Sequence, residues 1–239
     1  GMDSLVAALV ERLTADAIEL RKSVQGVERV DGQSRVTIAG EESPRAFDAV
    51  IVATPAGAAA RIVESGHESL SRELARIEHA ESIVVSIAVR RDQVGHPLDG
   101  FGFVVPHIEG RRIIAVSFAS QKFPDRAPDE QVLFRVFFGG ALQPELTRLA
   151  DQELLDLAIG ELADLVGLRG EPGFVDIARW AGAMPQYHVG HLDRVARIED
   201  LAAELPGLEL AGNAYHGVGI PQCIHSGEQA AERIASQFA

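Results

Sequence analysis

Three glycines near the C-terminus are the residues whose type and spacing most suggest chemistry. Gly212, Gly217 and Gly219 lie between the apolar run LELA and an amphipathic segment that begins at Pro221. Glycines let backbone N–H groups approach a flat or anionic ligand, and a helix starting near Pro221 would direct its positive dipole end to the same place. The pattern suits a dinucleotide, and it suits equally well a tight strand-to-helix connection without a ligand.

The remaining reactive side chains form no pattern typical of catalysis or metal binding. His188 and His191 are three residues apart, but PQYHVGH has no cysteine or carboxylate pair nearby, and a zinc site needs such ligands. His216 and His225 flank the glycines, where either can be an exposed loop residue. The sequence also has no G-x-S-x-G elbow and no Walker-type loop. We therefore expect no metal site and no catalytic acid, base or nucleophile.

Composition and charge exclude several classes of partner. The 239 residues are 46% hydrophobic and 24% charged, as in an ordinary globular protein, and the net charge of −13 disfavours nucleic acid. The single cysteine, Cys223, excludes an internal disulfide. No apolar run approaches the roughly 20 residues that span a bilayer, and no signal peptide is recognisable. We expect a cytoplasmic protein, with peripheral membrane association left open.

Hydrophobic periodicity predicts a mixed α/β fold. Residues 4–14 have helical spacing, and the short alternating segments of residues 17–53 predict a β-meander that leads into a buried strand. Residues 82–139 contain successive β-rich runs without helices between them, which indicates an antiparallel sheet. Residues 151–166 and 192–205 have helical spacing, and residues 174–180 read as one further strand.

The order of these elements predicts two interleaved lobes. Residues 1–78 and 206–239 should form one α/β lobe. Residues 79–205 should form a second domain inserted into it, an antiparallel sheet with helices. The Pro206-Gly207 pair marks the expected return to the first lobe.

Several motifs, taken together, resemble one family. The C-terminal AGNAYHGVGIPQCIHSGEQAA is preceded, in the family's order, by FDAVIVATPAGAAARIV, LDGFGFVVP, RVFFGGA and RWAGAMPQYHVGH. This series resembles the protoporphyrinogen and coproporphyrinogen oxidases, the porphyrinogen-oxidising branch of the amine-oxidase-like flavoproteins. The resemblance implies oxidation of a porphyrinogen in haem biosynthesis, with FAD as the cofactor and O2 as the acceptor. It also implies that residues 1–78 and 206–239 form a partial Rossmann-like lobe of the FAD/NAD(P)-binding type and that residues 79–205 form a substrate-binding domain. A flavin supplies its own redox chemistry, which agrees with the lack of titratable clusters.

The resemblance also implies roles for individual residues. Cofactor contacts are expected at the adenine, along the glycine segment and near the isoalloxazine: Val24, Gly212, Val218, Gly219, Ile220 and Trp180. Walls of the porphyrinogen pocket are expected from Phe101, Val104 and Phe137. Trp180 could instead be a core aromatic, Val24 an ordinary strand residue, and FGFVV a buried strand. Gln222 and Phe103 depart from residues often seen in the family, which puts the choice of porphyrinogen in doubt.

The family's opening strand and G-x-G-x-x-G turn have no counterpart in this sequence. We therefore interpret the chain as the C-terminal part of such an enzyme, and we expect it to lack FAD and activity by itself. Its expected partners are the porphyrinogen, an N-terminal FAD-binding half and, through exposed strand edges, other copies of itself. The alternatives are a non-catalytic module of a split flavoprotein, or a fragment of a carotenoid-desaturase-like or amine-oxidase-like enzyme. The RWAGAMPQYHVGH segment argues against a desaturase, and Gly212-Asn213 against an amine oxidase.

Overall fold

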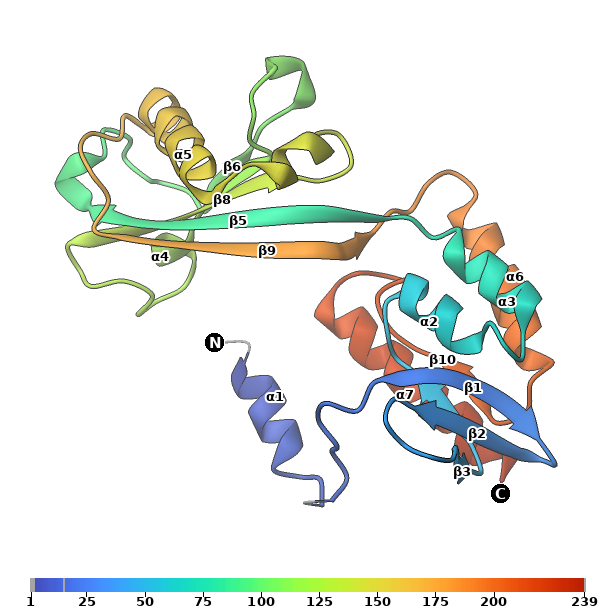
Figure 1. Cartoon of the computed structure of the whole chain (residues 1–239). Coiled ribbons are helices and arrows are strands. Elements are labelled where there is room, and N and C mark those ends of the chain that lie inside the picture. The colour runs from blue at the N-terminus through green and yellow to red at the C-terminus, as the bar shows by residue number, and fades with distance from the viewer. Residues whose placement is uncertain (1–2, 15, 239) are drawn as a thin grey trace. The chain divides into compact units, whose positions relative to one another are not determined.

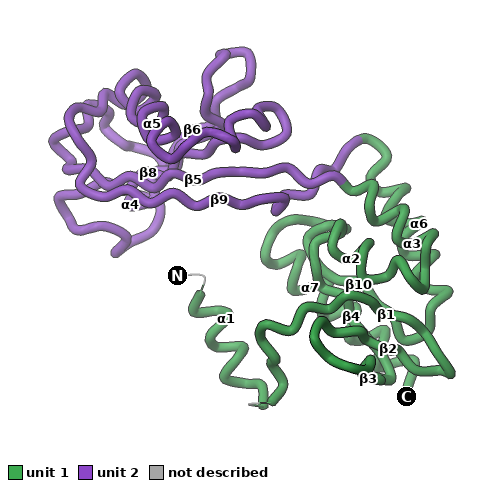
Figure 2. Tube along the Cα trace, viewed as in Figure 1, with its two compact units in different colours: residues 1–77, 189–239 green, residues 78–188 purple. Residues whose placement is uncertain are grey.

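The computed structural model describes residues 3–14 and 16–238, and the chain divides into two compact units (Figures 1 and 2). Unit 1 comprises Gly1–Ile77 and Val189–Ala239, and unit 2 comprises Glu78–His188. Both units combine helices with β-sheet, so the predicted mixed α/β class is confirmed.

The described residues of unit 1 form two small sheets and five helices. An antiparallel sheet has the order β1-β2-β3, and β4 and β10 form a parallel pair. The strands are β1 (Val24–Val30), β2 (Gln33–Ile38), β3 (Arg45–Phe47), β4 (Val50–Val52) and β10 (Leu208–Leu210). The helices are α1 (Asp3–Val10), α2 (Ala56–Val63), α3 (Glu68–Ala75), α6 (His191–Ala203) and α7 (Ile220–Gln237).

The local sequence explains the antiparallel sheet of unit 1. Asp31 and Gly32 have φ values of 52° and 77° between the paired residues Val30 and Gln33. An Asp-Gly pair tolerates such angles and makes a tight turn whose twist matches the strands. In β2 every second residue is buried, from Ser34 to Ile38, which fixes the face that the sheet turns towards its core.

Helix α1 differs in part from its prediction. The expected helix over residues 4–14 ends at Val10, and every residue of α1 is exposed. Leu9 and Val10 expose 54% and 47% of their surface, so the apolar stripe that predicts a packed helix has no buried contact within the described part of the chain. Amphipathic periodicity predicted the helix correctly, but it does not identify the surface that would cover it.

Unit 2 is built on a five-stranded antiparallel sheet of order β6-β7-β8-β5-β9. Its strands are β5 (His79–Arg90), β6 (Gly102–Val104), β7 (Ala115–Phe118), β8 (Gln131–Gly139) and β9 (Phe174–Pro185). Its helices are α4 (Ala119–Lys122) and α5 (Asp151–Val166), with short 3₁₀ turns at Arg91–Gln93, His107–Glu109 and Pro144–Arg148. The predicted strand over residues 174–180 continues to Pro185, because β9 stays paired with the long strand β5.

One face of this sheet carries the core of unit 2. Alternate residues of β5 and β8, such as Val85 and Phe134, are fully buried in one cluster with Leu154 and Leu162 of α5. The Phe118 ring packs edge-on against Phe134, with centroids 5.6 Å apart. Because side chains alternate along a strand, the residues between these core positions lie on the opposite face.

The second expected domain boundary is misplaced. The sequence predicts that helix α6 belongs with residues 79–205 to the inserted domain, but it lies in unit 1. Val195 and Ile198 of α6 are fully buried in the same cluster as Leu70 and Leu74 of α3. The chain thus returns to unit 1 near residue 189, and Pro206-Gly207 lies in the connection between α6 and β10, within unit 1. The first boundary, expected at residue 78, falls at Ile77.

Candidate functional site

The glycine segment lies at the carboxyl ends of the parallel strands of unit 1. Leu210 of β10 pairs with Val52 of β4, and the Ala211 N–H donates to the Val52 carbonyl at 3.1 Å. Each strand is followed by a loop and a helix, α2 after β4 and α7 after β10. Their two loops therefore start side by side, at the sheet edge where open α/β folds bind ligands.

The first half of the glycine segment is fixed to the helices around it. Gly212 has φ 127°, a region that side chains rarely adopt, and its N–H donates to Ser226 Oγ at 3.1 Å. Tyr215 is buried, and its carbonyl lies 3.0 Å from Nε2 of His191 on α6. Burial raises the pKa of the Tyr215 hydroxyl. These contacts hold the loop in one conformation.

The second half of the segment is open. Val218 and Ile220 expose 48% and 46% of their surface, and Gly219 precedes the first turn of α7 without any side-chain cap. A Cβ at Gly219 would lie 2.3 Å from Gln222 Oε1. A glycine at this position therefore lets the Gln222 side chain pack against the backbone of the loop. An uncapped helix N-terminus beside glycines suits a flat or anionic group. The site residues expected here thus belong to one segment: Gly212 is at its half-buried start, and Val218, Gly219 and Ile220 are at its open end, where α7 begins.

Val24 lies elsewhere in unit 1, at a smaller cavity. It shares a cavity of about 310 Å³ with Val36, Phe47 and other residues of the antiparallel sheet. Val24 is 37% exposed, so it is not a core residue. The polar rim of this cavity contains Glu19, Lys22 and Arg45.

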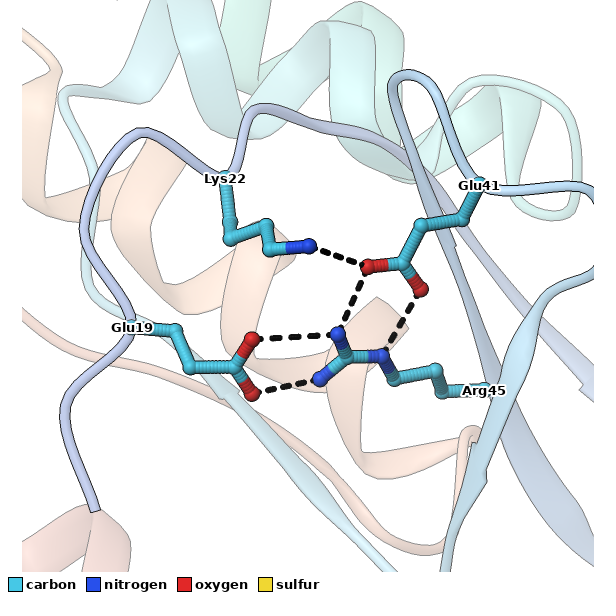
Figure 3. A network of polar contacts seen from close by, with 4 residues as sticks. All are labelled: Glu19, Lys22, Glu41 and Arg45. Atoms are coloured by element: carbon cyan, nitrogen blue, oxygen red, sulfur yellow. Dashed lines mark hydrogen bonds and ion pairs between the residues drawn. The ribbon is translucent and has the colours of Figure 1, made fainter. Parts of the chain in front are cut away.

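These rim residues form an ion-pair network with Glu41 (Figure 3). Glu41 accepts hydrogen bonds from Arg45 Nε and from Lys22 Nζ, each at 2.8 Å, and Glu19 contacts the other side of the Arg45 guanidinium. Hydrogen bonds from Arg45 and Lys22 lower the Glu41 pKa to about 2, and the two carboxylates raise the Arg45 pKa. Two anions balance two cations, so the network leaves this cavity without net charge.

A broad apolar cavity lies within unit 2, on the face of the sheet opposite the core. It has a volume of about 760 Å³ and is lined mainly by apolar side chains. One row of paired residues crosses four strands of this face: Val104 on β6, Ala115 on β7, Phe137 on β8 and Val84 on β5. Trp180 of β9 pairs with Ser82, next to that row. Pairing across β5 therefore places Phe137 and Trp180 at the same cavity.

The cavity has few polar groups, and the most basic of them, the guanidinium of Arg111, already forms ion pairs with carboxylates. Arg111 contacts Glu161 at 2.7 Å and Asp164 at 3.5 Å, and these carboxylates raise the pKa of its guanidinium. Gln143 lines the wall and donates from Nε2 to the Arg111 carbonyl at 2.7 Å. The other polar wall residues are Ser82, His107 and Gln186. A ligand that fits here needs a large apolar surface.

The structure separates the predicted site residues of unit 2. Phe137 and Trp180 line the cavity, and Trp180 is 55% exposed, which contradicts the alternative of a core aromatic. Val104 lies on the cavity's face of the sheet but is 75% exposed, and its neighbour Val105 forms part of the wall instead. Phe101 is 67% exposed and lies outside the cavity. The alternative of a buried strand over FGFVV is therefore also contradicted.

Several wall residues were not among those expected from the sequence. Ile113, Ile114, Met184 and Gln143 all line the cavity. Met184 could have been found from the unbroken run RWAGAMP, had it been read as a single long strand. Gln143 lies in a loop, where periodicity carries no information. Across residues 3–14 and 16–238 no cluster of three or more His, Cys, Asp or Glu could hold a metal ion, and no helix is long and apolar enough to cross a membrane.

Comparisons with known proteins match nearly the whole chain. The model of the flavin containing amine oxidoreductases matches residues 1–235. A coproporphyrinogen III oxidase from Propionibacterium freudenreichii subsp. freudenreichii is 35% identical over 98% of this chain, and a mitochondrial protoporphyrinogen oxidase from Nicotiana tabacum is 30% identical over 99% of it. The crystal structure of a protein provisionally assigned as a protoporphyrinogen oxidase, from Exiguobacterium sp. 255-15, superposes on the whole chain with a TM-score of 0.85 at 29% identity. The chain spans 44%, 50% and 51% of these three proteins, about half of each.

Proposed function

Because this chain belongs to the flavin containing amine oxidoreductases, we propose that it is the C-terminal part of an FAD-dependent porphyrinogen oxidase of haem biosynthesis, active in the cytoplasm. The reaction is the oxidation of protoporphyrinogen IX or coproporphyrinogen III to the porphyrin in successive two-electron steps, with O2 as the acceptor. The observation that carries this proposal is the apolar cavity of about 760 Å³ in unit 2, in a chain whose relatives are named for these two substrates.

The cavity suits the ring of a tetrapyrrole. Its volume lies within the range of roughly 300–1,000 Å³ that is typical of small-molecule sites. A sheet face gives a broad wall, and Phe137 and Trp180 offer aromatic surface on two of its strands. Carboxylated substituents of the ring need contact with water or with cations, whereas the ring itself is stabilised by leaving water. Phe137, Trp180 and Met184 would position the ring.

The glycine segment would hold one end of the cofactor. FAD, when bound, accepts the electrons of each step on its own ring. The exposed backbone from Val218 to Ile220 would line the flavin and ribityl region, and the uncapped start of α7 would face its polar groups. Val24 would contact the adenine through its backbone. No catalytic acid or base is assigned to this chain.

The absent G-x-G-x-x-G turn limits what residues 1–239 would do alone. That turn supplies the N–H donors that hold the pyrophosphate of a dinucleotide. We propose that this chain alone binds FAD poorly and is inactive, and that an N-terminal FAD-binding half is its partner in the active enzyme.

Two measurements test the proposed function. Coproporphyrin III and protoporphyrin IX, added to the purified chain, should quench the fluorescence of Trp180, the only tryptophan. Failure of both porphyrins to bind would contradict the assignment of the cavity. The absorption spectrum of the desalted chain should show no stoichiometric flavin, and porphyrinogen oxidation with added FAD should not exceed the rate in air without protein. Equimolar bound flavin, or catalysed oxidation, would contradict the proposed dependence on a second half.

A non-catalytic module of a split flavoprotein is the second candidate, and the missing phosphate-binding turn favours it. The two functions differ in one result. A porphyrinogen oxidase part should gain activity when it is mixed with the N-terminal half of a porphyrinogen oxidase and FAD. A module that only binds should still bind porphyrin but remain inactive in that mixture.

A further inference from the structure

Arg135 occupies a distinctive position on the cavity's face of the unit 2 sheet. It lies on β8 two residues before Phe137, so both side chains emerge on the same face. The Cζ atom of Arg135 lies 5.6 Å from the centroid of the Phe137 ring, in cation–π contact. Because Phe137 lines the cavity, its ring connects the guanidinium to the cavity wall.

The charge of Arg135 is not balanced by an acid. None of the acidic residues within the described ranges forms an ion pair with Arg135, and its direct cross-strand neighbours are Ser86 and Ser117. The nearest acid by strand pairing is Asp176, which lies beyond Ser86 on β9 and thus roughly 10 Å from Arg135 across two strand spacings. By contrast, Arg111 at the cavity already contacts Glu161 and Asp164.

We propose that Arg135 binds a carboxylate on the edge of the macrocycle and thereby sets the orientation of the ligand in the cavity. This inference rests on the proposed function and deepens it. A guanidinium that stacks on an aromatic ring keeps its N–H edge free for a carboxylate, which it can bind through two parallel hydrogen bonds. Arg111 with its two carboxylates carries a local net charge of −1, so that side of the cavity repels an anionic substituent. The carboxylates of the ring are therefore directed towards β8.

The side chain of Arg135 is exposed, so water and salt weaken the interaction. We expect the loss of one partly exposed, charge-assisted contact to lower affinity by about 5- to 10-fold. The role is that of a specificity-determining residue, because the carboxylates lie on the edge of the ligand, away from the atoms that are oxidised.

The test compares coproporphyrin III with its uncharged tetramethyl ester in titrations of the purified chain. Arg135→Gln should weaken coproporphyrin binding by about 5- to 10-fold and leave ester binding unchanged. The coproporphyrin affinity of Arg135→Lys should lie between those of the wild type and of Arg135→Gln, since lysine keeps the charge but lacks the planar guanidinium. The matched control is Arg90→Gln, which removes the same charge from an exposed arginine that pairs with Asp92 at the end of β5. Arg90→Gln should bind like the wild type.

Three results would overturn parts of this reasoning in different ways. If Arg135→Gln binds coproporphyrin as tightly as the wild type does, Arg135 is not a carboxylate ligand. If Arg135→Gln weakens the binding of coproporphyrin and of its ester equally, Arg135 acts by packing against Phe137, and the inference is again wrong. If the wild-type chain binds neither porphyrin, the proposed function itself fails, and the inference fails with it. Thermal melts of all variants, followed by circular dichroism, should nearly coincide with that of the wild type, because Arg135 is exposed and contacts only the half-buried ring of Phe137.

Discussion

Phe134 and Phe137 provide a direct test of the two faces of the unit 2 sheet. Both are on β8, but Phe134 is fully buried in the core against Phe118, whereas Phe137 is half-buried and lines the cavity. Replacing each by alanine makes the same chemical change on opposite faces. Phe134→Ala should lower the free energy of unfolding by about 3–5 kcal/mol, the usual cost of deleting a buried phenyl ring.

Phe137→Ala should have the opposite profile. Only part of its ring is removed from water by the fold, so its loss should cost about 1–2 kcal/mol of unfolding free energy. Porphyrin affinity should fall by about 10-fold or more, since about 1.4 kcal/mol of lost contact is enough for that change. Phe137→Leu, which keeps apolar volume without the ring, should recover most of the stability and part of the affinity.

Urea denaturation followed by far-ultraviolet circular dichroism measures the stability of each variant, and coproporphyrin titration measures its affinity. A domain of this kind has a total stability of about 5–15 kcal/mol, so the Phe134→Ala protein can be largely unfolded at room temperature. Phe134→Leu then serves as the milder core variant. The reasoning is refuted if Phe137→Ala is as destabilising as Phe134→Ala and leaves porphyrin affinity unchanged.

Three further predictions concern unit 1. The Tyr215 hydroxyl is buried and has no hydrogen-bond partner within the described chain, so Tyr215→Phe should keep or raise the thermal midpoint; a clear drop in a melting experiment would reveal a hidden partner. The Glu41 pKa is depressed from 4.5 to about 2, so the stability that Glu41 contributes is present above pH 4.5 and is lost as the pH falls towards 2. Glu41→Gln should therefore lose less stability than the wild type across that interval, and parallel acid-unfolding curves for the two proteins would contradict this. We also propose that the exposed apolar stripe of α1 and the open edges of the β4–β10 pair cause self-association. Light scattering should show dimers or larger species at micromolar concentration, and Leu9→Ser should reduce their amount. A monomeric wild type would refute the proposal.

Local patterns determined the elements and the family. The Asp31-Gly32 turn, the alternation along β8 and the spacing of α5 follow from propensities that act over a few residues. The glycine segment was recognisable because backbone conformation restricts residue type at Gly212 and Gly217, whose φ values are positive. These motifs also indicated the family, which the comparisons confirmed.

Only the tertiary structure decided which residues meet. Phe137 and Trp180 line one cavity because β5 lies between β8 and β9, a strand order that no local signal specifies. Phe101 was expected beside them, but it precedes β6 and lies exposed outside the cavity. Helix α6 has the same apolar stripe whichever unit it joins, and its packing against α3 places it in unit 1. Hydrophobic periodicity determines which face of an element is buried, whereas the partner of that face depends on chain segments far away in the sequence.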